Sequence, residues 1–314
     1  MARDRDPLVS VCIPTWNRER LLAGAIDSVL SQSFGDFEVI VSDNASSDGT
    51  GELVLACRDG RVRYLRNETN VGAPANWIKA ASAARGRYFM IIGDDDLLAP
   101  SFLETLVRPL ESDPNIVVSF CDHWVIDGSG SVQQESSDRY SRSYGRARLR
   151  PGWHDPFLDL ALHDQAFLTS AALIRLDRAR SLGALDLRAG KVLDYYLFAV
   201  LSLYPGAAYY IPERLASYRV HTASGSSLYQ ADLWRDMAWV CENLVGRVPG
   251  ARHARRLRTR WARAVTGEGA ALLRRGDRRG ALRSFGHAVR MAPLAPRPWI
   301  GLAVASTIGR WPPL

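Results

Sequence analysis

The stretch YFMIIGDDD, residues 88–96, places three consecutive aspartates after an apolar run and one glycine. The apolar run predicts a buried strand, and the charges mark its end. Adjacent carboxylates repel one another and resist burial, so three of them at the mouth of a buried strand indicate a cation that neutralises them. Hard oxygen ligands favour magnesium or manganese. A solvated turn is the alternative, because aspartate is common at strand-to-loop corners.

The preceding residues alternate between apolar and amphipathic stretches. Residues 8–15, 37–41 and 62–65 read as strands, and residues 18–31 read as a helix between the first two. Strands that alternate with helices indicate βαβ units and a parallel sheet, whose ligands bind beyond the carboxyl ends of the strands. Pro14, Thr15, Asp43 and the three aspartates all lie at such ends. The predicted fold class is therefore α/β.

Several short segments along the chain share a common order and spacing. They are IPTWNR at 13–18, SVLSQS at 28–33, SDNASSDGT at 42–50, NVG at 70–72, GDDDLLAP at 93–100 and YRVHTAS at 218–224. In these segments the sequence resembles the family 2 glycosyltransferases, over roughly residues 7 to 228. The resemblance implies a GT-A fold, a Rossmann-like and mostly parallel sheet flanked by helices. It also implies inverting transfer of a sugar from a nucleotide-diphosphate donor, a UDP- or dTDP-sugar, to a hydroxyl of a glycan, lipid-linked or small-molecule acceptor.

The resemblance also implies a donor site. A nucleotide base needs an aromatic face and a hydrogen-bond partner at its edge, and Trp16 and Asp43 would supply them. The other residues expected near the nucleoside and its phosphates are Pro14, Thr15, Asn17, Asn76, Asp94, Arg219 and Ser224. Core filling is the alternative for Trp16, a helix N-cap for Asp43 and a helix-surface position for Asn76.

A divalent cation, Mn²⁺ or Mg²⁺, is the implied cofactor, with Asp95, Asp96 and His221 as its expected ligands. It would bridge the two donor phosphates and stabilise the leaving nucleoside diphosphate. Asp96 has two further interpretations, support of the ligands or a helix cap. Gly93 stands where many relatives have the first aspartate of a DxD motif, which is a departure from the family.

Asp194 aligns with the family's catalytic aspartate, which deprotonates the acceptor hydroxyl. The glutamate that normally precedes it is Leu193 here, so the acidic pair is reduced to one residue. Because Asp194 opens the apolar helical stretch that runs to Leu203, an N-cap is the alternative.

Composition agrees with an enzyme that has a large core. The chain has 314 residues, of which 47% are hydrophobic. No apolar run reaches the ~18 residues of a spanning helix, and no apolar signal segment precedes the first strand. Four scattered cysteines without a CxxC pair indicate reduced thiols, not a zinc site. The expected location is cytoplasmic, with peripheral contact at the inner membrane face as an addition.

Basic charge is concentrated near the C-terminus. Residues 252–290 carry 12 arginines against Glu268 and Asp277, an excess of +10, whereas the whole chain carries +7. Basic helices favour anionic membrane surfaces, and no nucleic-acid-binding motif accompanies them, so no nucleic-acid partner is expected. Small and aromatic residues from Gly269 to Leu302 follow the spacing of a tetratricopeptide hairpin, with ordinary helices as the alternative. The expected division is a catalytic domain at 1–228 and a helical region at 229–314, with a homo-oligomer as an open alternative.

Two other functions are alternatives to sugar transfer. One is a non-catalytic nucleotide-sugar-binding or scaffold protein that docks through its basic tail, which Leu193 and Gly93 favour. The other is an NAD-dependent oxidoreductase, but no GxGxxG turn follows the first strand.

Overall fold

Alternating apolar segments form the expected strands and helices of an α/β fold. A computed structural model describes residues 5–221 and 230–307. Two compact units divide the chain: the first comprises Met1–Leu187 and Leu197–His221, and the second comprises Arg188–Tyr196 and Thr222–Leu314.

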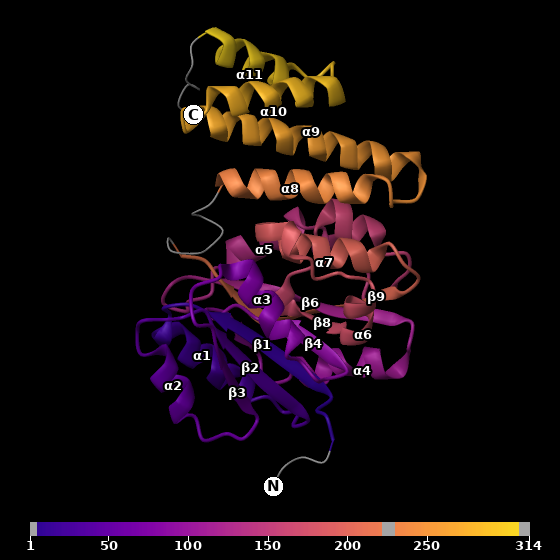
Figure 1. Cartoon of the computed structure of the whole chain (residues 1–314). Coiled ribbons are helices and arrows are strands. Elements are labelled where there is room, and N and C mark those ends of the chain that lie inside the picture. Colours follow the sequence, from indigo (N-terminus) through magenta and orange to yellow (C-terminus); the bar gives the residue numbers. More distant parts are fainter. Residues whose placement is uncertain (1–4, 222–229, 308–314) are drawn as a thin grey trace. The chain divides into compact units, whose positions relative to one another are not determined.

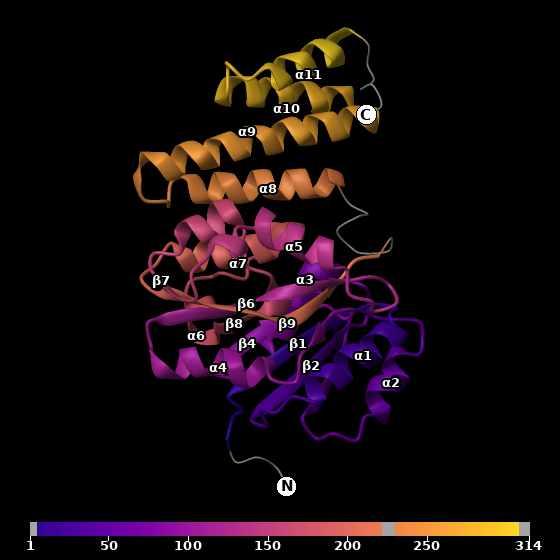
Figure 2. The same cartoon turned by 180° about the vertical axis from the view of Figure 1, so that it is seen from behind.

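The first unit contains a nine-stranded sheet of order β3-β2-β1-β4-β8-β6-β9-β5, with β7 paired to β9 (Figures 1 and 2). Its strands are β1 (Val9–Thr15), β2 (Phe37–Asp43), β3 (Val62–Arg66), β4 (Tyr88–Ile91), β5 (Leu97–Leu98), β6 (Ile116–Ile126), β7 (Gly152–His154), β8 (Ala172–Arg175) and β9 (Ala207–Arg219). Its helices are α1 (Glu19–Leu30), α2 (Thr50–Ala56), α3 (Ala73–Ser82), α4 (Phe102–Ser112), α5 (Gln134–Ser143) and α6 (Leu176–Ser181). Helix α7 (Leu193–Ser202) spans the boundary between the two units, and short 3₁₀ or π turns are η1 (Arg146–Arg148), η2 (Leu160–Asp164), η3 (Thr169–Ala171) and η4 (Leu187–Val192).

The sheet is mixed, where a mostly parallel one was expected. Strands β1 to β4 are mutually parallel, as the βαβ pattern predicts. Strand β8 is antiparallel to both β4 and β6, and β9 is antiparallel to β5 and β7. The difference arises because β8 follows a long irregular segment and not a helical crossover, so nothing forces it to run parallel.

Strand periodicity builds the core of the first unit. Val9, Val11 and Ile13 alternate along β1 and belong to one fully buried cluster with Leu22 of α1 and Leu106 of α4. Helix α3 packs against β1, β2 and β4. This packing holds the edge of the sheet at which β1, β2 and β4 end.

The second unit is built largely from helices α8 (Gln230–Val245), α9 (Gly250–Arg274), α10 (Arg278–Met291) and α11 (Pro296–Thr307). Phe285 of α10 is fully buried between two glycines, since a Cβ at Gly269 or Gly301 would lie within 3.0 Å of its ring. The small and aromatic positions noted in the sequence therefore meet in the helical packing.

Candidate active site

Two residues separate the three aspartates from the end of β4, and the chain there still pairs with β1. The backbone N–H of Ile92 donates to the carbonyl of Cys12, 3.0 Å away, so the sheet ladder continues up to Gly93. Asp94 and Asp96 are buried, and the Asp95 side chain is 14% exposed. They are not a solvated turn.

Arg18, which precedes α1, inserts its guanidinium between two of these carboxylates. Its Nη1 lies 3.1 Å from Asp94 Oδ1 and 2.5 Å from Asp95 Oδ2. His221 Nε2 lies 3.0 Å from the same Asp95 oxygen. One oxygen of Asp95 is thus the meeting point of an arginine and a histidine from opposite ends of the first unit's sequence.

Burial changes the acidity of this cluster. It raises the pKa of Asp94 to about 6, against the lowering effect of the Arg18 charge. Burial and then the charge of Asp95 raise the pKa of Asp96 well above its usual range. Positive charge beside buried carboxylates favours their ionised form.

Asp96 is held by the protein on both oxygens. Oδ2 accepts from the Ser170 hydroxyl at 2.6 Å, and Oδ1 accepts from the backbone N–H of Arg219 at 2.9 Å. Helix α4 begins at Phe102 with Ser101 as its N-cap, so Asp96 is not a helix cap. Its two bonds instead tie the acidic loop to β9 and η3.

Gly93 is enclosed by the carboxylates that follow it. A Cβ at this position would lie 2.9 Å from Asp95 Oδ1 and 3.0 Å from Asp96 Oδ2. The glycine therefore makes room for the two aspartates.

At the end of β1, Trp16 is half exposed and Thr15 is buried. Core filling is therefore excluded for Trp16. The buried Thr15 Oγ1 has no hydrogen-bond partner within the described residues. Pro14 is buried in the strand, and Asn17, with φ of 51°, accepts from the backbone N–H of Ser47 at 2.7 Å.

Asp43 ends β2 beside Thr15, its partner in the parallel register. It is fully buried and accepts from the Ser46 N–H at 2.9 Å, the Tyr64 hydroxyl at 2.6 Å and Arg66 Nη1 at 2.8 Å. Helix α2 begins at Thr50, so Asp43 is not its N-cap.

Asn76 is buried, which excludes the helix-surface position considered for it. Its amide donates to the Ser42 carbonyl at 2.7 Å, and its oxygen accepts from the Ser42 hydroxyl at 2.7 Å and from Asn67 at 3.0 Å. It therefore holds the β2 end in place.

Arg219 is buried and donates to backbone carbonyls, those of Asp95 at 2.8 Å and Asp127 at 3.0 Å. Ser224 lies outside the described residues. Asp194 belongs to the second unit, in the first turn of α7, where its exposed side chain accepts from the Tyr195 N–H at 2.7 Å.

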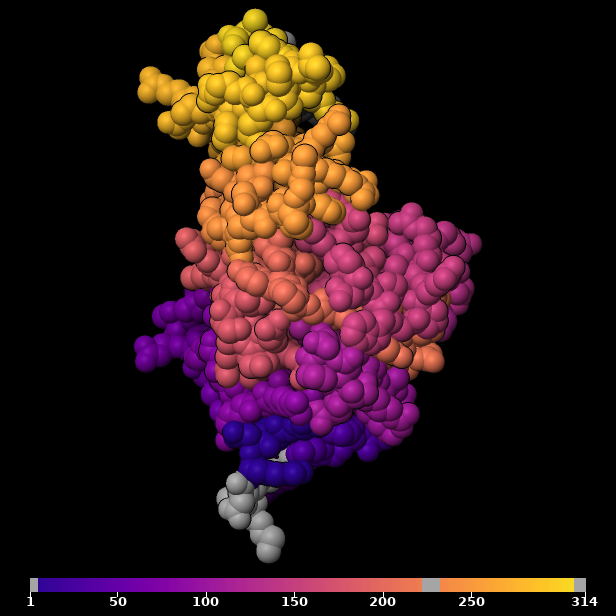
Figure 3. Space-filling model, turned by 90° about the vertical axis from the view of Figure 1, so that its right-hand side faces the viewer, coloured from indigo at the N-terminus to yellow at the C-terminus, as the bar shows by residue number. Residues whose placement is uncertain are grey.

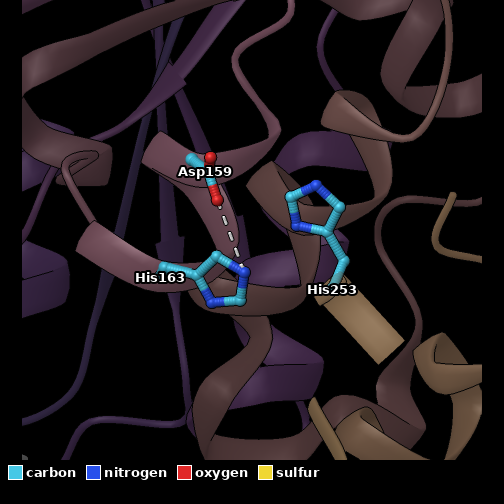
Figure 4. Close-up of side chains that lie close together, drawn as sticks. All are labelled: Asp159, His163 and His253. Atoms are coloured by element: carbon cyan, nitrogen blue, oxygen red, sulfur yellow. Dashed lines mark ion pairs between the residues drawn. The ribbon is translucent and has the colours of Figure 1, made fainter. Parts of the chain in front are cut away.

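Sequence reasoning assigned no role to Arg18, Tyr64, Arg66 or Ser170. Arg18 belongs to the IPTWNR segment and immediately precedes α1. This position was the one sequence feature that could have indicated a role for it. Another titratable pair is Asp159, the residue before η2, and His163 on η2, with 3.5 Å between Oδ1 and Nε2 (Figure 4). His253, also drawn there, belongs to the second unit.

An α/β sheet whose parallel strands end at an acidic loop, with an exposed aromatic side chain beside it, defines a nucleotide-binding class of fold. Residues 10–167 match the model of glycosyl transferase family 2, which is half of the chain. The chain belongs to this family.

Relatives and solved structures agree with this assignment. The chain is 32% identical over 227 residues to the uncharacterized protein MT1568 of Mycobacterium tuberculosis, covering 69% of this chain and 68% of that protein. It is 35% identical over 136 residues to the GalNAc(5)-diNAcBac-PP-undecaprenol beta-1,3-glucosyltransferase of Campylobacter jejuni, covering 42% and 43%. The crystal structure of S. aureus TarS 1–349 with UDP-GlcNAc superposes with a TM-score of 0.66 at 15% identity, covering 95% of this chain and 87% of that one. This likeness shows the GT-A fold.

The matched segment spans only part of most of these proteins. For the first curated relatives the covered share of their length runs from 68% down to 35%. None of the helices in residues 5–221 and 230–307 is long and apolar enough to cross a membrane.

Proposed function

We propose that the chain transfers a sugar from a nucleotide-diphosphate donor to a hydroxyl, with inversion at the anomeric carbon. The observation that carries the proposal is the acidic loop after β4, where Asp94 and Asp95 meet the cation of Arg18 and the imidazole of His221. Family membership supports it. A UDP- or dTDP-sugar is the proposed donor, and the proposed acceptor is a glycan, a lipid-linked sugar or a small molecule.

For the donor base we propose stacking on Trp16 and recognition by Asp43. The three hydrogen bonds to Asp43 use three of its about four acceptor positions, which leaves one on Oδ1 for a pyrimidine imide N–H. Because Asp43 is fully buried, this contact requires Arg66, whose side chain is 49% exposed, to move aside. The unpartnered Thr15 hydroxyl and Asp94 face the nucleoside in this proposal, and Asn17, Asn76 and Arg219 support the loops around it.

Asp95 and His221 fit a divalent cation, since they present an oxygen and a nitrogen ligand in direct contact. Manganese or magnesium bound there would neutralise the donor's diphosphate and stabilise it as a leaving group. Asp96 holds the loop through Ser170 and the Arg219 backbone, so we assign it a supporting role. Arg18 would exchange its contact with Asp95 for a donor phosphate oxygen, for which a guanidinium is well suited.

Asp194 is the proposed general base. As the acceptor oxygen forms its bond to the anomeric carbon, the bond from that carbon to the phosphate oxygen breaks, and the Asp194 carboxylate takes the hydroxyl proton. Its side chain is exposed, as an attacking acceptor requires. Leu193 is buried in α7, so a single carboxylate carries this step.

The test is nucleoside diphosphate release by purified protein from a panel of nucleotide sugars, with and without Mn²⁺. Asp95→Asn should abolish metal-dependent donor binding and turnover. Asp27→Asn, at an exposed position on α1, is the matched control and should keep both. Full turnover by Asp95→Asn would remove the metal assignment. Donor binding without any turnover in the wild type would instead support the alternative, a non-catalytic nucleotide-sugar-binding protein, which Leu193 favours.

A further inference from the structure

Three large apolar side chains lie in solvent around the turn between α10 and α11. Leu294 is 97% exposed, Ile300 is 54% exposed and Trp299 is 50% exposed. Such a group is unusual on a surface that has no bound partner, because each residue loses the stabilisation of burial. The C-terminal helices that contain them are coloured orange to yellow in the space-filling view (Figure 3).

The turn is held in shape by the protein. The indole N–H of Trp299 donates to the Pro293 carbonyl at 2.8 Å, which closes the turn over the start of α11. Pro298 is buried, and Gly301 packs against the Phe285 ring. Leu294 therefore lies at the tip of a turn that these contacts hold in a defined shape.

Basic residues gather at the same end of the second unit. Arg290 and Arg297 flank the turn and are exposed. The Trp261 ring of α9 meets the His287 ring of α10 at 5.6 Å, so the C-terminal end of α10 lies beside the N-terminal half of α9. That half carries the exposed Arg255 and Arg258.

Two other arginines of the same helices serve as an internal comparison. Arg278, at the start of α10, donates to the carbonyl of Ala305 at 2.7 Å, so it joins two helices. Arg260 is also engaged, because its guanidinium lies 5.1 Å from the centre of the Tyr195 ring. The solvent-facing arginines near the turn are thus distinct from those that hold the helices together.

We propose that this apolar–basic edge, formed by Leu294, Trp299 and Ile300 with Arg255, Arg258, Arg290 and Arg297, docks on an anionic lipid bilayer. Leucine and isoleucine would enter the acyl boundary, tryptophan would lie at the headgroup level, and the arginines would contact lipid phosphates. A nucleic acid would use the arginines but would gain little from a leucine in solvent. The charge and the apolar tip together therefore favour a membrane.

The experiment is co-sedimentation of the full chain with vesicles of phosphatidylcholine alone or mixed with phosphatidylglycerol, in the absence of donor. We expect binding to the mixed vesicles that falls with added salt. Leu294→Ser with Ile300→Ser should weaken it about tenfold or more. The matched control is Leu55→Ser, at a 72% exposed leucine on α2 of the first unit, which should leave binding unchanged.

Each other outcome overturns the proposal. Equal vesicle binding by the double variant and the control would exclude the apolar tip as the anchor. No vesicle binding, with a dimer in sedimentation that the double variant loses, would assign the edge to a second copy of the chain. Binding to DNA that outcompetes vesicles and ignores the two serines would assign the arginines to nucleic acid. Because none of these measurements involves sugar transfer, failure here leaves the proposed activity untouched.

Discussion

Arg18→Gln is the substitution that tests whether the acidic loop after β4 depends on added positive charge. Arg18 bridges Asp94 and Asp95 through one nitrogen, and the three side chains are 23%, 10% and 14% exposed. Removing one partner of a buried ion pair costs about 3–5 kcal/mol. Since these side chains retain some solvent contact, we expect a loss of about 2–3 kcal/mol in unfolding free energy, or roughly 5–10 °C in Tm of the first unit.

The same substitution should increase the response to a divalent cation. Arg18 contacts Asp95 and would compete with an ion bound there as proposed, whereas glutamine would not. Manganese at millimolar concentration should therefore raise the Tm of Arg18→Gln more than that of the wild type and recover most of the loss.

The assay is thermal unfolding in EDTA and in Mn²⁺, followed by circular dichroism. Arg20→Gln is the control, because this exposed arginine lies two residues further along in α1. The reasoning is refuted by either of two results: equal Tm values for the two variants in EDTA, or a smaller manganese shift in Arg18→Gln than in the wild type.

The remaining predictions concern the base, a buried histidine and the helical packing. Asp194→Asn should lower turnover by roughly 10² to 10⁴ with donor affinity little changed, and equal loss of donor affinity would mean a structural role. Burial, and then the charge of Arg146, lower the pKa of His123 to about 3. Between that pH and the unfolded pKa, His123 is protonated in the unfolded chain and neutral in the folded one. Stability should thus fall as pH drops below the unfolded value of about 6.5, and between pH 7.5 and 5.5 urea unfolding of His123→Phe should lose about 1.4 kcal/mol less than the wild type. Gly301→Ala should destabilise the second unit by about 1–3 kcal/mol, because a Cβ there would meet the buried Phe285 ring, and Phe285→Leu should relieve the effect; an unchanged denaturation midpoint would contradict it.

Most of the fold could be predicted from the sequence because β1, β2 and β4 are apolar runs that end in polar residues. Those ends meet at one edge of the sheet, as the parallel arrangement requires. The antiparallel direction of β8 could not be predicted, because a strand of four residues carries no sequence signal for its direction.

The geometry of the candidate site could be predicted less fully from the sequence than the fold. The sequence identified the aspartates but not the guanidinium between Asp94 and Asp95, because the rotamer of Arg18 depends on the loop that follows β1. Asn76 is a polar residue in a helix, which favours a position on the surface. Only the fold shows that it is buried against Ser42. The roles of these residues in catalysis stay predictions until the variants are measured.

The space around Gly93 limits how the proposed metal site could be re-engineered. An aspartate at this position, as the resemblance to the family suggests, would add a carboxylate to the proposed metal site. The space is already filled, however, by the carboxylates of Asp95 and Asp96. A fourth acid would push those two apart before it reached any ion. If Asp95 and His221 hold a cation as proposed, its identity is therefore more open to adjustment at His221 than at the end of the strand that precedes the aspartates.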